Sequence, residues 1–546
     1  MYERYKKIAL PAMLISVVLT ALTLIFPQIG FLEWITLIPL FLGAFVYCAD
    51  EQRTLWRTYW GGFLTVFVYY FVIYHWFLSL YPLDFIGMDN VSSVVVVFAG
   101  WVGLSVLQAI PGGLIFLIFK ILQRGGVFER TPILRPIVFS ALWIVFEWSS
   151  TLGWTGVPWG RLCIGQSECL PALQSASLFG SYFVSFLVLI VNGLLAYAII
   201  HYRTRIQAVF CVALAVVILC SNILLGYGMM NKKDEDRVTV KVAAIQGNVD
   251  MDAKGGATKE LMRVYGEMTR EAVAAGAKIV VWPESIFPYR MNRYPILEDF
   301  VCALAAECDV TLIVGALYGA NDGKSYNTLY MVTPDGKISD TLYHKRHLVP
   351  FGEYVPMRDV FMTLIPPLTE LSALDDDMTP GTETSLFETE WGKLGGLICF
   401  DSIYEELTRA SAKDGANLML LPSNDSWWFS TSVETYQNET QAMLRAIESG
   451  RYLVRAGNTG ISSIITEHGE HKAWLAPETK GIAISDVEMC TQTTLYTRIG
   501  NSFVYLCMAF VLLLYPVDFI MHKYKKDIER RTNICRNGVP KIGNLN

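Results

Sequence analysis

Long apolar stretches are the feature that most limits how this chain can fold. Apolar windows fill residues 8 to 226 and return at about 501 to 521, whereas the stretch between them has ordinary globular polarity. Of the 546 residues, 53% are hydrophobic and only 17% are charged, which is too apolar for a wholly soluble chain. The pattern predicts a membrane domain that carries one large polar insert.

The apolar windows have the length of membrane-crossing helices, which need about 17 to 25 largely apolar residues. We predict about eight crossings, near residues 8–26, 31–48, 59–79, 92–119, 137–151, 181–200, 206–226 and 501–521. The first window could instead be a cleaved signal peptide, but it lacks a small-residue cleavage site before Pro27, so we expect a retained anchor. The predicted organisation is a membrane domain over 1–228 with seven transmembrane helices, a linker over 229–236, a catalytic domain over 237–497, an eighth transmembrane helix over 498–522 and a cytoplasmic tail over 523–546.

The distribution of Lys and Arg predicts how the chain crosses the membrane, because cytoplasmic loops retain these residues. They cluster before the first predicted crossing and after the second, fourth and sixth, at Arg4, Lys6, Lys7, Arg53, Arg57, Lys120, Arg124, Arg130, Arg135, Arg203 and Arg205. The alternate loops near 27–30 and 80–91 contain no Lys or Arg, and the segment from 152 to 180 has only Arg161. We therefore expect a cytoplasmic N-terminus and an extracytoplasmic insert.

The polar insert alternates strand and helix patterns. Short apolar runs such as VTVKVAAIQGN, AKIVVWPES and VTLIVGALYG are typical of buried strands. Between and after them, amphipathic helices are predicted over 256–275, 295–308, 404–414 and 434–449. The insert is therefore predicted to be an α/β layer domain.

Three residues of the insert form a set with a common chemistry. Glu284 ends the apolar strand KIVVWPES, Lys345 lies in LYHKRHLVPFGEYVP, and Cys399 ends the apolar run GKLGGLICF. A thiolate can attack a carbonyl carbon, a carboxylate can remove the thiol proton, and an ammonium can stabilise the oxyanion that forms. Taken singly, a buried Cys usually serves only to pack the core, and a Lys in a basic run is usually a solvent-exposed charge. As an ordered set, the residues indicate acyl transfer.

The order and context of these residues resemble the nitrilase, or carbon-nitrogen hydrolase, superfamily. The stretches HLVPFGEYVP, PSNDSWWF, LRAIESGRYLVRAGNTGIS and TLYTRIGN look like one membrane-bound branch of it, the apolipoprotein N-acyltransferases. The upstream stretch GWTGVPWGRLCIGQSECLPALQSASLFGSYFVSFLVLIVN does so too, so the resemblance covers nearly the whole chain. It implies a membrane α-helical bundle beside an extracytoplasmic domain with the four-layer αββα sandwich of nitrilases.

The resemblance also implies roles for individual residues. Cys399 corresponds to the nucleophile, Glu284 to the general base and Lys345 to the oxyanion stabiliser, while Glu353 matches a second glutamate that orients the lysine and assists the base. Further substrate or lipid contacts are expected at Phe400, Asp401, Trp427 and Trp428.

The activity implied is the transfer of a fatty acyl chain from a membrane phospholipid to Cys399 as a thioester, and then to the N-terminal α-amine of S-diacylglyceryl-cysteine in apolipoproteins. The implied site is the bacterial inner membrane, which the chain crosses several times, with the catalytic domain on the periplasmic face. We expect the protein to be a monomer that contacts the bilayer. We expect it not to bind nucleic acid. The seven scattered His residues form no zinc-like spacing with Cys, so we predict no metal and no cofactor.

Departures from the family pattern occur around the predicted site. Phe400 and Asp401 stand where the family usually has Tyr and Glu, Gly255 replaces a tryptophan, and Asn438 replaces a histidine. Spacing alone leaves open whether Cys163 pairs with Cys169, or Cys302 with Cys308.

Two other functions remain compatible with parts of the sequence. A membrane-tethered nitrilase-type amidase would keep the same three residues but hydrolyse a small amide. A transporter with an accessory domain would need ionisable residues inside the spans, and apart from Glu33 and Glu147 these are scarce.

Overall fold

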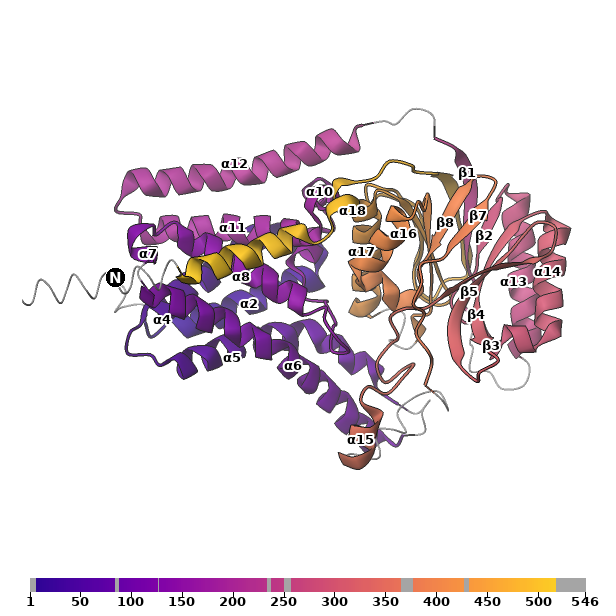
Figure 1. The fold of residues 1–546 in the computed structure, drawn as a ribbon, viewed down its shortest axis with the longest axis horizontal. Helices are drawn as coiled ribbons and strands as arrows, with labels where there is room; N and C mark the ends of the chain where they lie inside the picture. Colours follow the sequence, from indigo (N-terminus) through magenta and orange to yellow (C-terminus); the bar gives the residue numbers. More distant parts are fainter. Residues whose placement is uncertain are drawn as a thin grey trace, which may run out of the picture.

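The computed structural model describes residues 6–83, 88–125, 127–232, 237–249, 257–364, 377–426 and 432–516. It has two regions, a helical bundle formed by the N-terminal part of the chain and an α/β domain that follows it (Figure 1). The last described helix leaves the α/β domain and runs back along the bundle (Figure 1). This arrangement confirms the predicted fold class.

Helices occur at all eight predicted crossing positions, but their lengths differ from the prediction. The bundle contains α2 (Ala9–Ile25), α3 (Glu33–Thr36), α4 (Ile38–Ala49), α5 (Leu55–Ile73), α6 (Asn90–Gly125), α7 (Val127–Arg130), α8 (Leu134–Ser149), α9 (Leu170–Leu173), α10 (Ala176–Phe179), α11 (Ser181–Ile200) and α12 (Arg205–Met230). Five segments of the described chain are long and apolar enough to span a bilayer, namely Pro27–Ala49, Leu55–Leu80, Asn90–Arg124, Ser181–Ile200 and Arg205–Met230. The apolar helices Ala9–Ile25 and Ser502–Pro516 are shorter, and α8 has 16 residues. The number of crossings therefore stays a prediction.

The bundle packs tightly where small residues let two helices approach. A Cβ atom added to Gly112 of α6 would lie 2.6 Å from the Val66 side chain of α5, and one added to Gly62 of α5 would lie 2.4 Å from Phe116 of α6. Small residues at helix contacts are typical of membrane bundles, in which packing rather than the hydrophobic effect holds helices together.

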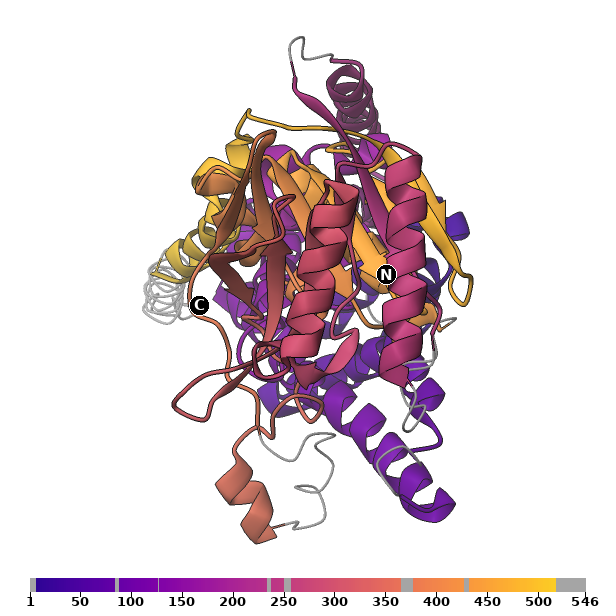
Figure 2. The ribbon, with the colours of Figure 1, turned by 90° about the vertical axis from the view of Figure 1, so that its right-hand side faces the viewer.

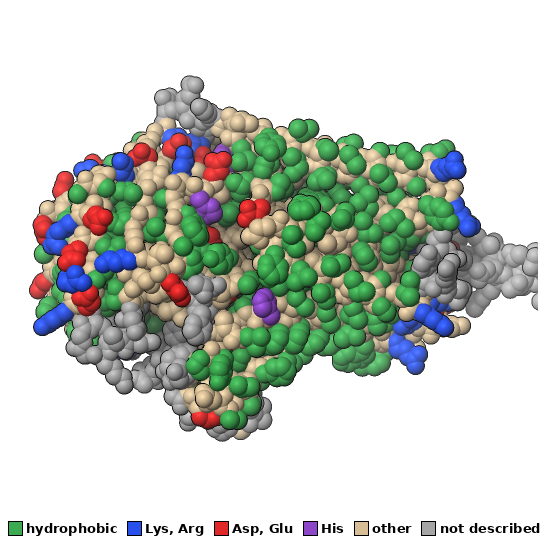
Figure 3. All heavy atoms as spheres, turned by 180° about the vertical axis from the view of Figure 1, so that it is seen from behind, with side chains coloured by type: hydrophobic (Ala, Val, Ile, Leu, Met, Phe, Trp, Pro, Cys, Tyr) green, Lys and Arg blue, Asp and Glu red, His purple; other side chains and the backbone are tan. Residues whose placement is uncertain are grey.

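The surface of the bundle is apolar, whereas that of the α/β domain is charged. Figure 3 shows hydrophobic side chains covering the bundle, charged side chains on the α/β domain, and Lys and Arg at the far end of the bundle. On α12, for example, Ile206 is 86% exposed and Val209 is 67% exposed. An outward-facing apolar surface of this extent indicates contact with lipid.

The α/β domain contains two β-sheets. The strands of the first sheet follow the order β13 (Gly481–Glu488), β1 (Thr239–Gln246), β2 (Ile279–Val281), β4 (Thr311–Gly319), β5 (Ser325–Val332) and β6 (Ile338–His344), and β3 (Phe287–Arg290) also pairs with β4. Those of the second sheet follow the order β12 (His471–Leu475), β11 (Ser462–Ile465), β10 (Tyr452–Gly457), β9 (Leu418–Ser423), β8 (Gly392–Gly396) and β7 (Leu386–Thr389). The pairs β1–β2, β2–β4, β8–β9 and β9–β10 are parallel.

Four layers result from helices on the outer faces of the two sheets (Figures 1 and 2). The helices α13 (Ala257–Ala274) and α14 (Pro295–Cys308) cover the first sheet, while α16 (Glu405–Lys413) and α17 (Val433–Ser449) lie on the side of the second sheet that faces the bundle. The inter-sheet core includes Val242 of β1 and Leu420 of β9, whereas Ala243 of β1 packs under the outer helices. The αββα sandwich is thus confirmed, with each of the four predicted helices found within two residues of its expected ends.

The bundle and the second sheet's helices share one hydrophobic core. Residues of α16 and α17 such as Leu407 and Leu444 belong to the same buried cluster as Phe45 and Trp143 of the bundle. The helix α17 is therefore enclosed on both sides, by its sheet and by the bundle. The remaining short elements are η1 (Pro27–Leu32), η2 (Tyr74–Leu80), η4 (Leu162–Gln166), η5 (Met291–Arg293), α15 (Arg358–Leu364), η7 (Cys399–Ile403) and α18 (Leu495–Ile499).

Candidate active site

The ends of three strands place the predicted residues. Glu284 follows β2 and Lys345 directly follows β6, both in the first sheet, whereas Cys399 follows β8 of the second sheet and begins η7. The carboxyl end of a strand is where side chains leave a sheet into a loop, and active sites of α/β proteins commonly lie there.

Lys345 is the centre of a buried cluster of charges. Its Nζ atom lies 3.0 Å from Oε1 of Glu284 and 3.0 Å from Oε1 of Glu353, and its side chain is 1% exposed. The amide nitrogen of Asn327 donates hydrogen bonds to the same two oxygens, at 2.7 Å and 2.9 Å. The structure thus brings Glu284, Lys345 and Glu353 together.

The other oxygens of both carboxylates accept hydrogen bonds from the backbone. Oε2 of Glu284 accepts from the N–H of Asn424 at 2.9 Å, and Oε2 of Glu353 accepts from the N–H of Val349 at 2.8 Å. These contacts fix the direction of each carboxylate. Sequence reasoning missed Asn327, although an Asn within the apolar strand SYNTLYMV is a signal that could have found it.

The cluster shifts the proton affinity of its members. Burial raises the pKa of Glu284, and the charge of Glu353 adds to this shift against the opposing effect of Lys345. Burial alone would lower the pKa of Lys345, but the carboxylates of Glu284 and Glu353 outweigh it and raise that pKa well above its ordinary value. Lys345 is therefore an ammonium, and Glu284 is a stronger base than an exposed carboxylate.

The nucleophile candidate has an unusual backbone conformation. Cys399 has a φ of +45°, in the left-handed region that non-glycine residues seldom adopt, and Ser285, next to Glu284, has a φ of +49°. Such conformations cost on the order of 1 to 3 kcal/mol and cluster at functional sites. The turn is held by the hydroxyl of Ser402, which donates to the carbonyl of Cys399 at 2.8 Å.

Burial raises the pKa of the Cys399 thiol, and the nearby carboxylate of Glu284 raises it further. Lys345 and a hydrogen bond with Ser423 act in the opposite direction but do not overcome burial. The thiol is therefore neutral at rest and needs a base to form the thiolate. Ser423 in turn donates to Asp425 at 3.0 Å. Sequence reasoning matched the stretch PSNDSWWF to the family without assigning a role to either residue.

Comparison with known proteins places the chain in a family. Residues 241–494 match the model of the carbon-nitrogen hydrolase family, and residues 16–194 match that of the apolipoprotein N-acyltransferase N-terminal domain. The apolipoprotein N-acyltransferase of Geobacter metallireducens is 32% identical over 512 residues, which cover 91% of this chain and 92% of that protein. The chain belongs to the apolipoprotein N-acyltransferase family.

Other relatives and solved structures are similar to this member of the apolipoprotein N-acyltransferase family. The Gloeobacter violaceus apolipoprotein N-acyltransferase is 30% identical over 500 residues, covering 90% of this chain and 91% of that protein. Saccharomyces cerevisiae Nit3, a nitrilase superfamily member, is 20% identical with a TM-score of 0.36, covering 46% of this chain and 90% of that one. A carbon-nitrogen hydrolase from Helicobacter pylori G27 is 19% identical with a TM-score of 0.37, covering 52% and 94%.

Asp401, which departs from the pattern of the apolipoprotein N-acyltransferases, lies between the nucleophile and lysine segments. Its fully buried carboxylate accepts hydrogen bonds from the Tyr343 hydroxyl at 2.8 Å and from the N–H groups of His347 and Ile398 at 2.8 Å and 3.0 Å. Because its oxygens are occupied by donors within the protein, Asp401 positions the turn of Cys399 relative to the strand that leads to Lys345.

The structure describes only some of the other substrate or lipid contacts predicted for this apolipoprotein N-acyltransferase. The ring of Phe400 stacks on Trp159, which belongs to the bundle region, with ring centroids 6.1 Å apart. Trp427, Trp428 and Gly255 lie outside the described residues.

Among the described residues, no group of three His, Cys, Asp or Glu side chains could hold a metal ion. Neither of the two cysteine pairs considered above forms a disulfide in the structure, because Cys163, Cys169, Cys302 and Cys308 are all free thiols.

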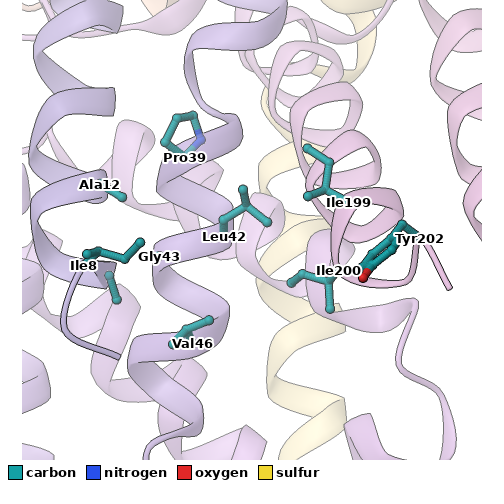
Figure 4. Close-up of a pocket in the computed structure, with 10 residues that line it drawn as sticks. Ile8, Ala12, Pro39, Leu42, Gly43, Val46, Ile199, Ile200 and Tyr202 are labelled. Atoms are coloured by element: carbon teal, nitrogen blue, oxygen red, sulfur yellow. The ribbon is translucent and has the colours of Figure 1, made fainter. Parts of the chain in front are cut away.

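A cavity of about 440 Å³ lies far from this chemistry, between α2, α4 and α11 (Figure 4). Its lining includes Ile8, Pro39, Leu42 and Ile199 and offers few polar groups. No residue of the candidate active site lines it.

Proposed function

We propose that this acyltransferase of lipoprotein maturation works through an acyl-enzyme on Cys399. Family membership makes the chain an acyltransferase with lipid and lipoprotein substrates. In our proposal, the acyl donor is a membrane phospholipid and the acceptor is the N-terminal α-amine of S-diacylglyceryl-cysteine in an apolipoprotein. The assigned residues are Cys399 as nucleophile, Glu284 as base, Lys345 as oxyanion stabiliser and Glu353 as the partner that orients Lys345.

In the first half-reaction, Glu284 takes the proton of the Cys399 thiol and the sulfur attacks the ester carbonyl carbon of the phospholipid. The ammonium of Lys345 stabilises the oxyanion of the tetrahedral intermediate. When the intermediate collapses, the carbon–oxygen bond to the glycerol breaks, and the protonated Glu284 gives its proton to the departing lysophospholipid. The acyl chain then remains on Cys399 as a thioester.

In the second half-reaction, the α-amine of the acceptor attacks the thioester carbonyl. An α-amine has an ordinary pKa of about 7.7 to 8.0, so an appreciable fraction is neutral near pH 7. Lys345 again stabilises the oxyanion, Glu284 accepts the amine proton, and the carbon–sulfur bond breaks to give a stable amide. The proton returns to the sulfur and restores the free enzyme.

The contact of Lys345 with both Glu284 and Glu353 is the observation that carries this proposal, because it joins a base to a fixed positive charge. The position of the Cys399 turn supports a lipid donor. Phe400 stacks on Trp159, and the hydroxyl of Tyr404 donates to the carbonyl of Gly156 at 2.6 Å, so the turn adjoins the bundle. A buried site that adjoins the bundle would also keep water, the competing acceptor, scarce.

The proposed location is the bacterial inner membrane, with several crossings, the domain boundaries predicted above and the α/β domain on the periplasmic face. The gathering of Lys and Arg at the bundle end opposite the α/β domain supports this orientation (Figure 3). A topology reporter inserted near Asn321 should behave as extracytoplasmic, and one inserted after residue 526 as cytoplasmic. A cytoplasmic signal near Asn321 would contradict the proposal, because exported lipoproteins could not reach the site.

The order of product release tests the proposed reaction. The full chain in phospholipid micelles should form a lysophospholipid first, and an N-acylated lipopeptide only after a diacylglyceryl-cysteine peptide is added. Blocking the α-amine of that peptide should leave the thioester in place and stop turnover. Rapid release of ammonia from small amides, with no transfer to the lipopeptide, would favour the amidase alternative instead.

A further inference from the structure

A buried ion pair joins the bundle region to the element that follows the nucleophile. The guanidinium of Arg161 lies 2.5 Å from Oε2 of Glu405, and the two side chains are 1% and 2% exposed. Glu405 begins α16, six residues after Cys399, whereas Arg161 precedes η4 in the bundle region. The hydroxyl of Tyr182 accepts from Arg161 at 2.9 Å and donates to Oε1 of Glu405 at 2.9 Å. The side-chain amide of Asn501, before the last helix, also donates to Oε1, at 3.1 Å.

A second buried pair also contacts the nucleophile turn. Arg445 and Glu448, both on α17, are 2.7 Å apart. Nη1 of Arg445 donates to the carbonyls of Ser402 and Ile403 at 3.4 Å and 3.3 Å, which are the last two residues of the turn that Cys399 begins. Oε1 of Glu448 accepts from the N–H of Ser181 at 2.9 Å, at the start of α11. The turn is therefore connected to the bundle through both pairs.

Both members of the first pair are charged. Burial alone would lower the pKa of Arg161, but Glu405 and its neighbours raise it well above its ordinary value. Burial would raise the pKa of Glu405, but Arg161 and Arg445 lower it to about 2. Arg161 and Glu405 balance each other, so removing one charge would leave the other buried and uncompensated, which is strongly destabilising.

Arg161 could be interpreted as a phosphate-binding residue, because it is the only basic residue between 152 and 180. Its environment argues against this interpretation. The guanidinium is enclosed by Glu405, the hydroxyl of Ser181 at 3.3 Å, and the Tyr182 ring, whose centroid lies 4.7 Å away. An anionic head group would have to displace Glu405 to reach it.

We propose that Arg161 is a positioning residue for the acyl-transfer reaction. Through Glu405 it fixes the segment that carries Cys399 onto the bundle, so that the reactivity of the thiol depends on the membrane region even toward a donor that is not a lipid. This inference rests on the proposed role of Cys399 as nucleophile. Ordinary docking of two domains would need only apolar contact, whereas a buried ion pair tied to the turn defines one orientation.

The test compares a soluble and a lipid donor on the full chain in detergent micelles. Release of p-nitrophenol from p-nitrophenyl butyrate reports acylation of Cys399 without any lipid, and lysophospholipid formation reports acylation by phospholipid. We expect Arg161→Met and Glu405→Gln to lower the rate constant of the first turnover, the burst of p-nitrophenol or of lysophospholipid, by on the order of tenfold to a hundredfold, as for a misplaced reacting group. The concentration of the soluble ester that half-saturates this rate should stay unchanged, and Arg161→Lys, which keeps the charge, should recover most of the rate.

The matched control is Arg451→Met. Arg451 is also a buried arginine, but its guanidinium donates hydrogen bonds to backbone carbonyls of the α/β domain, including that of Gly450 at 2.9 Å. The Arg451→Met variant should have a lower unfolding temperature, but its acylation rate per folded molecule should not fall comparably. Equal losses of rate in Arg451→Met and Glu405→Gln would overturn the inference, because the effect would then be one of general stability.

Two other outcomes would be equally decisive. If Arg161→Met and Glu405→Gln slowed only the phospholipid reaction, Arg161 would act on lipid presentation and the inference would be wrong. If Arg161→Met did not fold, Glu405→Gln, which keeps the shape and the Tyr182 hydrogen bond, would carry the same comparison. Failure of the proposed function would look different, since Cys399→Ser would then release p-nitrophenol as fast as the natural protein.

Discussion

The bundle and the α/β domain differ in where their apolar residues point. In the α/β domain the side chains of a strand alternate between two cores, so that Val242 and Ala244 of β1 face the other sheet while Ala243 faces the outer helices. In the bundle, apolar residues face outward as well as inward, and α12 is apolar on all sides. Apolar residues therefore mark buried positions in the α/β domain, whereas in the bundle they indicate that a helix is present but not which of its faces is buried.

Two buried carboxylates of the α/β domain also differ in their use from those of the bundle. In the bundle, Glu33 accepts from the side chain of Gln166 at 2.7 Å, and Glu147 accepts from the N–H of Leu162 at 3.1 Å, so both hold the segment between α8 and α11 in place. In the α/β domain, Glu284 and Glu353 share one ammonium beside a thiol. The comparison indicates that the chemistry belongs to the α/β domain and that the bundle supports it.

The largest effect is expected from Cys399→Ser, which tests whether the chemistry lies in the α/β domain. A hydroxyl is a much weaker nucleophile than a thiolate, so lysophospholipid formation should fall by at least about a thousandfold. The unfolding temperature in phospholipid micelles should remain close to that of the natural protein. Full activity in this variant would move the nucleophile to another residue, and Cys302 or Cys308 would be examined next.

The second effect is that of Lys345→Met, which removes the charge shared by the two glutamates. Loss of one oxyanion-stabilising group typically costs about 3 kcal/mol, or a hundredfold to a thousandfold in rate. The rate of thioester formation on Cys399, measured by rapid quenching, should fall by this factor. If the variant formed thioester at the natural rate, Lys345 would not be the oxyanion stabiliser. Arg346→Met, on the neighbouring half-buried residue, is the matched control.

The third effect concerns pH. Because burial and the charge of Glu353 raise the pKa of Glu284, activity should fall on acidification at a pH above the ordinary carboxylate range. Glu353→Gln removes a negative charge and leaves Lys345 paired with Glu284 alone, and both changes lower the pKa of Glu284. The acidic limb of the profile of kcat/KM against pH should therefore move to lower pH. A shift to higher pH would contradict the assignment of Glu284 as the base.

The smallest effect is expected at the lipid-facing surface. Val216 on α12 is 52% exposed, whereas its neighbour Ala215 is 1% exposed. We expect Val216→Leu to change the free energy of unfolding by less than about 0.5 kcal/mol, and Ala215→Leu to lower it by about 1 to 3 kcal/mol through overpacking. Denaturation in phospholipid micelles measures both. Equal costs at the two positions would show that the exposed face of α12 is covered by something other than lipid.

Much of the site could be predicted because its residues carry local signals. Glu284 and Cys399 each end an apolar run, and the two sheets and their helices follow from patterns of period two and period 3.6. The position of Asn327 in an apolar strand is a signal, but its role could not be assigned, because that role depends on two glutamates that lie 43 and 26 residues away in the chain. The pair of Arg161 and Glu405, 244 residues apart, was missed for the same reason. The substrate contact predicted at Asp401 stays a prediction, and only the fold reveals the donors within the protein that bind its carboxylate.

Helix lengths in the bundle were the least predictable feature. The apolar window at 137–151 corresponds to α8, which has 16 residues, and the predicted crossing at 31–48 is divided between η1, α3 and α4. The composition of a segment shows how apolar it is. The ends of a helix also depend on local turns and on packing against neighbouring helices, and composition does not determine these.

The central claim is that Cys399 carries the acyl chain between lipid and lipoprotein. Incubation of the full protein with a phospholipid of one defined acyl chain, followed by proteolysis and mass spectrometry at mildly acidic pH, tests it directly. The account predicts that the peptide containing Cys399 gains the mass of that acyl group, and that the added mass disappears when a diacylglyceryl-cysteine peptide is supplied. An unmodified Cys399 peptide during active turnover, or an acyl group on a different residue, would contradict it.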